Sequence, residues 1–168
     1  MKISMVNHAS VFIETEDIGF LSDPWFFGTA FNDSWALEYK TKEKLTKKIL
    51  DKLTHIYVSH EHPDHLHFPT LKYIQQNCKN KISIIIQNLP RKEILKALKK
   101  IGFHKIIEVK SRKFLNLKNN IYVYLYSVFP VDSACAFIKK NNNEKDIVIL
   151  NLNDTELCNY DLRVIKKD

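Results

Sequence analysis

The stretch that most restricts the possible folds of this chain is His60-Glu61-His62-Pro63-Asp64-His65, which follows the apolar run Ile56-Tyr57-Val58. A short apolar run next to polar turn residues is typical of a buried strand. Imidazole nitrogens and carboxylate oxygens are ligands that zinc, iron and manganese bind in proteins. The motif therefore predicts a divalent metal site at the end of a buried strand. The alternative is a polar loop that holds three histidines and no metal.

The spacing inside the motif favours metal binding. His60 and His62 are two positions apart, so in an extended segment their side chains point to the same side and can converge on one ion. Pro63 lacks a backbone N–H and favours a turn, which would direct Asp64 and His65 toward a second ion or to the far side of the first. Each ligating imidazole also needs an acceptor for its other N–H group.

Hydrophobic patterning predicts strands that alternate with helices in the middle of the chain and form hairpins near both ends. Strands are expected over residues 3–6, 11–14, 20–22, 55–59, 82–87, 105–109, 121–126, 134–138 and 146–152. Helices are expected from a cap at Thr41 to Leu53, from Pro69 to Asn77, and from Asn88 or Pro90 to a C-terminal cap at Gly102. This order predicts an α/β fold with a mixed sheet, or two sheets with helices outside. We predict one domain over residues 1–168, since there is no repeat and no linker.

Residues 23–39 are irregular and rich in aromatic side chains. They include Trp25, Phe26, Phe27, Phe31 and Trp35. A loop of this length is uncommon unless it has a function or covers something. We expect these side chains either to wall a substrate pocket or to belong to the core.

The formal net charge of +7 comes from 26 Lys and Arg against 19 Asp and Glu. The lysines are spread over several segments, so nucleic-acid binding is an open but unfavoured prediction. The same positive field would attract a small anionic substrate.

The three cysteines, Cys78, Cys135 and Cys158, form no Cys-x-x-Cys pair. Reduced thiols and a cytoplasmic location fit this pattern, and it excludes a thiolate-rich zinc site. No apolar run approaches the roughly 20 residues that span a bilayer, and the start of the chain does not resemble a secretory signal.

The motif and its surroundings resemble the metallo-β-lactamase fold superfamily. Within it, the chain is similar to the branch of L-ascorbate-6-phosphate lactonases, N-acylphosphatidylethanolamine phospholipase D and CMP-sialic acid hydroxylases. The stretches that carry the resemblance are Asn7-His8-Ala9-Ser10-Val11, Leu21-Ser22-Asp23-Pro24 with Trp25, residues 60–69, and Asn151-Leu152-Asn153-Asp154. Together they extend from residue 3 to about residue 156.

The resemblance implies an αββα sandwich with the metal site at the sheet edges. It implies that His60 and His62 bind a first metal, that Asp64 and His65 bind a second, and that Asp154 bridges them. The metal would be one or two divalent ions, zinc being favoured and iron or manganese being alternatives. Residues expected to support the ligands or to contact substrate are His8, Asp23, Trp25 and Asp132, of which Asp23 would steady the motif loop. Asp154 could instead be a plain turn residue or helix cap.

The sequence departs from the family pattern in two places. Phe129 stands where another histidine of the first metal is expected, and Asp132 is the nearest replacement. The family's final histidine does not appear before Asp168, so we expect either a fragment of a longer protein or a shortened homologue that lacks the C-terminal strands. Such a chain would keep one ion on the Asp64, His65 and Asp154 side. It would also expose a sheet edge that could mediate oligomerisation.

The function implied is that of a metal-dependent hydrolase. A metal-bound hydroxide would attack an ester, lactone or phosphodiester of a small anionic substrate, while Asp64 orients the water and transfers its proton. One alternative is an oxidative enzyme similar to sialic acid hydroxylases, which would need a partner iron–sulfur protein because this chain lacks cluster ligands. Another is a binding homologue with a degraded site. His55, His67 and His104 are expected at the surface or half-buried.

Overall fold

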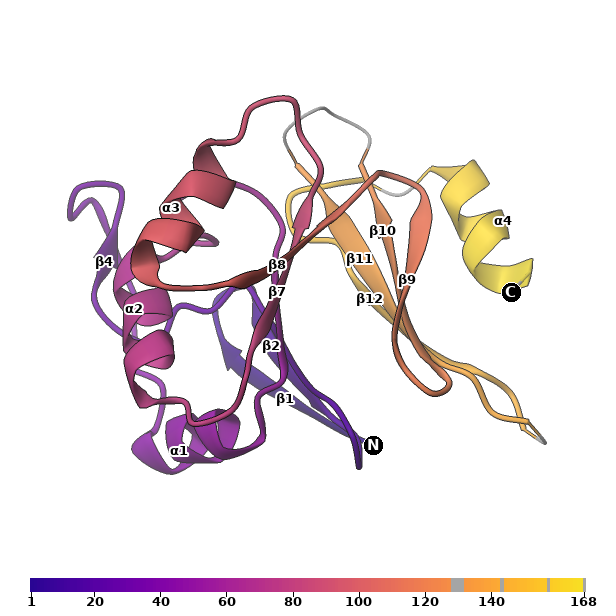
Figure 1. The fold of residues 1–168 in the computed structure, drawn as a ribbon, viewed down its shortest axis with the longest axis horizontal. Helices are drawn as coiled ribbons and strands as arrows, with labels where there is room; N and C mark the ends of the chain where they lie inside the picture. Colours follow the sequence, from indigo (N-terminus) through magenta and orange to yellow (C-terminus); the bar gives the residue numbers. More distant parts are fainter. Residues whose placement is uncertain (128–131, 143, 157, 168) are drawn as a thin grey trace. The chain divides into compact units, whose positions relative to one another are not determined.

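The computed structural model describes residues 1–127, 132–142, 144–156 and 158–167, and the chain divides into two compact units (Figure 1). The first unit comprises residues 1–86 and 90–107. The second comprises residues 87–89 and 108–168. Each is built on its own β-sheet, and the single domain over residues 1–168 stays a prediction.

The first unit contains most of a six-stranded mixed sheet. Its strands, in spatial order, are β1 (Lys2–Asn7), β2 (Ser10–Glu14), β3 (Gly19–Ser22), β6 (His55–Val58), β7 (Ser83–Gln87) and β8 (Lys105–Val109). The first three pair antiparallel as hairpins, whereas β3, β6 and β7 run parallel. The central strand β6 is buried at every position, as expected for a parallel strand with both faces covered.

Three helices accompany this sheet: α1 (Glu43–Lys52), α2 (Phe68–Asn77) and α3 (Glu93–Ile101) (Figure 1). Ile49, Leu71 and Leu98, one from each helix, join the core formed by the strands. Gly102 adopts a φ of 111° and ends α3, which confirms the predicted glycine cap. The cap predicted at Thr41 is wrong, because α1 begins after Lys42 without a side-chain cap.

The aromatic segment 23–39 contains a small hairpin of β4 (Thr29–Ala30) and β5 (Trp35–Ala36). Trp25 and Phe26 are buried in the unit, whereas Trp35 is 52% exposed. The expectation of a place in the core therefore holds for the first aromatics of the segment, and the expectation that the aromatics wall a substrate pocket stays a prediction.

The second unit contains a four-stranded antiparallel sheet. Its strands, in spatial order, are β12 (Ile147–Asn151), β11 (Ala134–Lys139), β10 (Ile121–Tyr126) and β9 (Lys113–Lys118). Helix α4 (Asn159–Lys167) packs on this sheet through Ile165, which contacts a cluster that includes Tyr124 and Tyr126. The sequence analysis predicted neither β9 nor α4: each is short and mixes apolar with polar or charged side chains, and β9 leaves four of its six residues exposed.

The elements together are those of an α/β fold of the metallo-β-lactamase type, as predicted: two sheets, each with α-helix packed against it. None of the helices in the described part of the chain combines the length and apolarity that crossing a membrane requires.

Candidate metal centre

The motif lies in a loop between the buried strand β6 and helix α2 of the first unit. The carbonyl oxygen of His62 accepts hydrogen bonds from the N–H groups of His65 (3.0 Å) and Leu66 (2.7 Å). These bonds close a turn around Pro63, as predicted. The turn brings Asp64 and His65 back toward the end of β6, where both side chains are buried.

The two histidines before the turn converge. Nε2 of His60 lies 2.9 Å from Nδ1 of His62, and their ring centroids are 4.6 Å apart. Two imidazole nitrogens at this distance must share a proton or a cation, because two bare lone pairs would repel each other. The expected convergence of these side chains is therefore present, with His60 buried and His62 exposed.

Ser59, which the sequence analysis did not single out, links two of the histidines. Its buried Oγ lies 2.9 Å from Nδ1 of His60 and 3.3 Å from Nδ1 of His65. A hydroxyl oxygen can accept both N–H groups, which supports the Nδ1 side of each ring. The available signal was its position, between the buried strand and the first histidine of the motif.

Asp23, which follows β3, forms hydrogen bonds with the segment that leads into the motif loop. Its N–H donates to the carbonyl oxygen of Tyr57 (2.9 Å), and its Oδ1 accepts the N–H of Ser59 (2.8 Å). Its Oδ2 lies 3.3 Å from Nδ1 of His65. This contact sets a carboxylate charge beside the Nδ1 side of the His65 ring, without a hydrogen bond that would assign its tautomer. These contacts fit the steadying role predicted for Asp23.

Asp64 is the carboxylate at the centre of the cluster, and it is only 5% exposed. Its Oδ2 lies 2.8 Å from Nε2 of His8 and 3.3 Å from Nε2 of His65. Its Oδ1 is buried and accepts no hydrogen bond from any described residue. A buried carboxylate oxygen without a donor is costly, so this set of carboxylate and imidazole atoms fits a divalent cation.

A cavity of about 550 Å³ adjoins the cluster within the first unit. Its lining residues are Asn7, His8, Trp25, Ser34, Trp35, Ala36, Leu37, Glu38 and Tyr39. His8 and Trp25 therefore contribute both to the cavity wall and to the surroundings of Asp64, with their ring centroids 5.4 Å apart. The predicted substrate-contacting position of these two residues gains geometric support from this arrangement.

Two histidines outside the motif are more buried than expected. The placement of His55 and His67 at or near the surface is wrong, since both are under 10% exposed. Burial lowers the pKa of His67, whose Nδ1 accepts the N–H of Thr70 and so caps α2. Burial, together with the charge of Lys105, lowers the pKa of His55 to about 4. His104 is exposed, within what was expected.

Two predicted site residues belong to the second unit. Asp132 is half-buried just before β11, and Asp154 is exposed in the turn after β12. Phe129 lies outside the described residues. The bridging role of Asp154 and the replacement role of Asp132 stay predictions.

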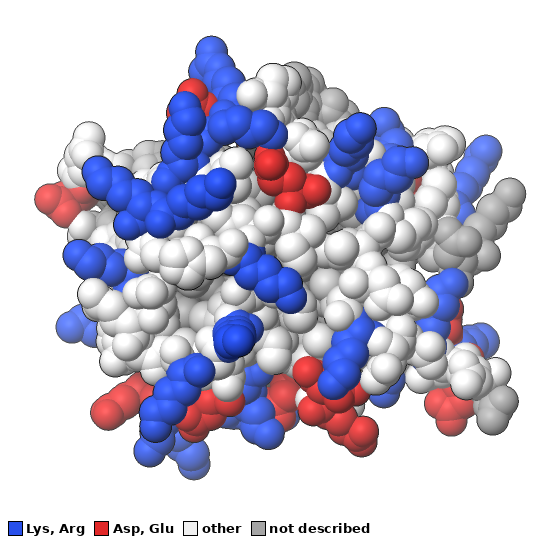
Figure 2. Space-filling view, in the orientation of Figure 1, with Lys and Arg blue, Asp and Glu red and all other residues white. Residues whose placement is uncertain are grey.

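Positive charge is distributed over several parts of the face drawn in Figure 2 and not gathered in one patch.

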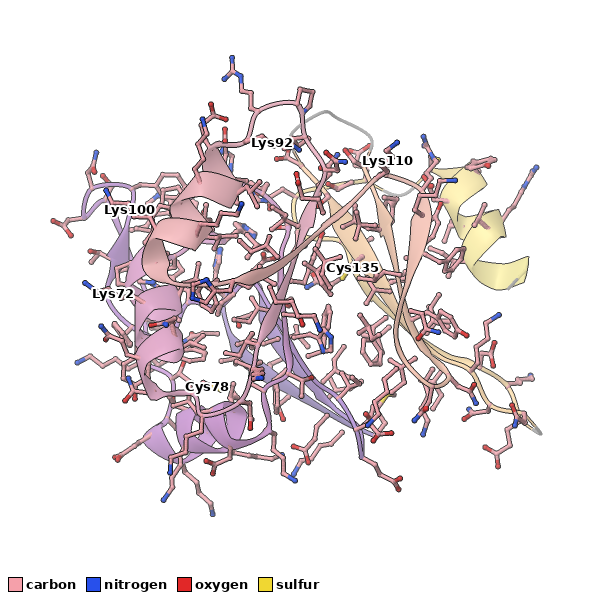
Figure 3. The ribbon with its side chains drawn as sticks, in the orientation of Figure 1. Lys72, Cys78, Lys92, Lys100, Lys110 and Cys135 are labelled. Carbon is pink, nitrogen blue, oxygen red and sulfur yellow. The ribbon has the colours of Figure 1, made fainter. Side chains whose placement is uncertain are left out.

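A groove of about 590 Å³ between α2 and α3 carries Lys72 and Lys100 beside Phe68 and Ile101 (Figure 3). The labelled Cys78 and Cys135 lie in different units, and neither is in a disulfide in the described structure.

Comparison with known proteins identifies relatives of this chain. Over 144 residues it is 28% identical to the cytidine monophosphate-N-acetylneuraminic acid hydroxylase of Asterias rubens, a match that covers 82% of this chain and 21% of the relative. The chain thus spans about a fifth of the length of this curated relative.

Two solved structures share the fold. One is CmlA, a diiron beta-hydroxylase from Streptomyces venezuelae, with a TM-score of 0.63, 18% identity, and coverage of 87% of this chain and 28% of the other. The second is an isothiocyanate hydrolase from Delia radicum gut bacteria, with a TM-score of 0.62, 18% identity, and coverage of 99% and 67%.

Residues 2–126 match the sequence profile of the beta-lactamase superfamily domain, which is the larger part of the chain. The motif loop, the strand that delivers it and the two-sheet fold agree with this match, so the chain belongs to the beta-lactamase superfamily, in the metallo-β-lactamase branch that its motif predicted.

Proposed function

We propose that this chain is a metal-dependent hydrolase whose ligands include His60, His62, Asp64 and His65. The observation that carries the proposal is the buried Asp64 carboxylate, which faces imidazole nitrogens and has one oxygen without a hydrogen bond among the described residues. A site of this kind is costly to bury unless a cation neutralises it. We propose zinc as the metal, with iron or manganese as alternatives, and Asp154 as a further ligand on the basis of the resemblance.

A divalent ion bound here would supply an acidified water and would polarise the scissile carbonyl or phosphoryl group. The protein supplies the orientation of the reacting groups. Ser59 and Asp23 hold the Nδ1 sides of His60 and His65, so that both Nε2 atoms face the reaction site. Asp64 can accept a proton from the attacking water at Oδ1, the oxygen that lacks another partner in the described structure.

We propose a small ester, lactone or phosphodiester as the substrate, with an anionic group that the net charge of +7 would attract. The cavity beside His8 would receive the substrate. We also propose that the protein is cytoplasmic and that it self-associates through β12. That strand is at the edge of its sheet and exposes Ile147, Val148 and Leu150.

The proposal is tested by metal analysis of the 168-residue protein, purified without chelators. We expect a stoichiometric divalent metal in the unaltered protein and in a His104→Ala control, since His104 is exposed, and a strongly reduced content in His60→Ala and Asp64→Ala. Phosphodiesters, lactones and thioesters would then be screened with the metal that is found. Unchanged metal content in both site variants would exclude the proposed ligands, and metal binding without any turnover would favour a binding protein.

The hydroxylase relative, which matches 82% of the chain, favours a second candidate function. In this case the site would hold iron and receive electrons from a partner iron–sulfur protein. Purified protein that contains iron and no zinc, and that changes its absorption spectrum on reduction, would favour the oxidative function. Zinc with hydrolytic turnover would exclude it.

A further inference from the structure

His8 lies far from the motif in sequence and next to it in space. It follows β1, 56 positions before Asp64, yet its Nε2 is 2.8 Å from Oδ2 of that aspartate. The ligand atoms of His8, Asp64 and His65 all lie within 4.8 Å of one another. Three donors this close, from two separate segments of the first unit, can occupy one face of a single cation.

The backbone at His8 is held in an unusual conformation that serves this position. Its φ is 44°, in the left-handed region that residues with a side chain rarely adopt, and the pairing of β1 with β2 shifts register between Met5 and Asn7. Such a residue costs roughly 1–3 kcal/mol and persists where the surrounding structure requires it. Here the result is that the imidazole is directed at Asp64.

The ring of His8 is also fixed from its sides. It makes edge contacts with Trp25 at 5.4 Å, Trp35 at 6.4 Å and His65 at 5.7 Å between ring centroids. These contacts favour the rotamer that faces the carboxylate, and 34% of the His8 side chain stays exposed. A histidine that only neutralised Asp64 would not need this support, because an exposed ion pair tolerates many rotamers.

We propose that His8 is a direct ligand of a divalent cation, which it binds together with Asp64 and His65. This inference rests on the proposed function and extends it, because it places a complete three-residue cation site within the first unit. In the cation-bound protein, Nε2 of His8 would offer its lone pair to the ion in place of the hydrogen that it now shares with Asp64. Oδ2 of Asp64, which lies 2.8 Å from Nε2 of His8 and 3.3 Å from Nε2 of His65, would complete this face together with that His65 nitrogen.

The position of His8 also connects the cation with the cavity of about 550 Å³, whose wall includes His8, Trp25 and Trp35. A substrate in this cavity would therefore meet the ion at the His8 side. Burial of the Trp25 indole, whose Nε1 has no hydrogen-bond acceptor among the described residues, leaves one donor near the cavity for an acceptor group of the substrate.

The decisive experiment replaces the His8 imidazole by a different ligand with its own spectroscopic signal. The whole chain and its His8→Cys, His8→Ala and His104→Cys variants are loaded with Co²⁺, and their absorption is recorded. A thiolate bound to Co²⁺ gives a charge-transfer band in the near ultraviolet. We expect this band in His8→Cys and not in His104→Cys, whose new thiol is exposed and distant from the motif.

Zinc affinity, measured by competition with a chromophoric chelator, gives a second readout. We expect His8→Ala to weaken the binding of one zinc equivalent by more than about a hundredfold, since loss of a direct ligand should exceed the roughly ten- to hundredfold effect of losing an outer partner. Binding that stays unchanged in His8→Ala, and the absence of the band in His8→Cys, would overturn the inference. If His60→Ala still lost metal in that case, the proposed hydrolase site would stand without His8. An unaltered protein that bound no cation would overturn both.

Discussion

Among the described residues three aspartates are buried, Asp23, Asp64 and Asp161, and the surroundings of Asp64 and Asp161 differ in kind. Asp161, in α4 of the second unit, is fully buried and surrounded by donors. It accepts hydrogen bonds from Arg112 (Nε, 3.1 Å), Tyr124 (3.3 Å) and Cys158 (2.8 Å). Asp64 in the first unit is 5% exposed. Among the described residues its Oδ2 contacts the imidazoles of His8 and His65, and its Oδ1 has no hydrogen-bond donor.

The difference separates a carboxylate whose donors are held by the fold from one that we propose as a cation ligand. Burial alone would raise the pKa of Asp161, but the hydrogen bonds from Cys158 and Arg112 outweigh it and lower that pKa below its usual range. Burial and the nearby Asp161 in turn raise the pKa of Tyr124 to about 12. No comparable set of fixed donors meets Asp64. A protein tolerates such a group where function requires it, at some cost in stability.

The largest expected effect concerns metal affinity. Asp64→Asn keeps the shape of the side chain and removes its charge, so we expect zinc binding to weaken by at least about a hundredfold, or about 2.7 kcal/mol. Asp161→Asn and the exposed Asp51→Asn should leave the affinity unchanged. Isothermal titration with zinc would measure the three variants, and equal losses in Asp64→Asn and Asp161→Asn would remove the distinction between the two carboxylates.

A second effect concerns stability. Arg112→Met removes the one arginine that contacts Asp161 and leaves a buried charge with fewer donors. Losing one partner of a buried ion pair costs about 3–5 kcal/mol, and because the Arg112 side chain is 44% exposed we expect about 2 kcal/mol. Urea unfolding of the metal-free protein would measure it, with Lys113→Met as a control. A loss no greater than that of the control would show that Tyr124 and Cys158 suffice.

The lowered pKa of Asp161 predicts a dependence of stability on pH. A carboxyl whose pKa is lower in the folded than in the unfolded state stabilises the fold above the unfolded pKa, and this contribution disappears as the pH falls through the folded value. We therefore expect the free energy of unfolding to fall below about pH 4, and to fall less in Asp161→Asn. Thermal unfolding between pH 3 and 7 would test this, and identical slopes in both proteins would contradict it.

Substitution of Asp23 should weaken metal affinity less than substitution of Asp64, because Asp23 supports the proposed ligands and is not proposed to bind the cation itself. Asp23→Asn keeps an oxygen for the N–H of Ser59 but offers no second anionic oxygen to His65. Removing the partner of a ligating imidazole typically weakens metal binding by about ten- to a hundredfold, and we expect the lower end. Competition titration with zinc would detect it. A loss as large as that of Asp64→Asn would instead make Asp23 a ligand.

The smallest effect should be the stability of metal-free Asp64→Asn. Since Oδ1 of Asp64 has no donor to lose, we expect a free energy of unfolding within about 1 kcal/mol of the unaltered protein, or higher. Chelator-treated samples in urea would show this. A large destabilisation would mean that Asp64, like Asp161, has a mainly structural role.

Several features of the molecule follow from local sequence. The strands of the first sheet, the strands β10, β11 and β12 of the second, and the first three helices lie where hydrophobic periodicity and Gly102 predicted them, because burial of one face and the backbone freedom of glycine act within a few residues. The turn at Pro63 and the convergence of His60 with His62 also follow from spacing alone. The prediction failed for α4 and β9, whose apolar faces are too narrow to stand out from their charges.

Tertiary structure decided what surrounds the motif. No local pattern places Asp23 beside His65, since this contact depends on the parallel pairing of β3 with β6. The contacts of Ser59 with His60 and His65 are local, but the second forms only because the turn at Pro63 brings His65 back. Likewise, only the folded chain brings His8 to Asp64 across 56 positions. The sequence determines which donors exist and where each strand delivers them, because these depend on local geometry. Which donors share one site depends on strand order, and that is set by contacts between distant segments.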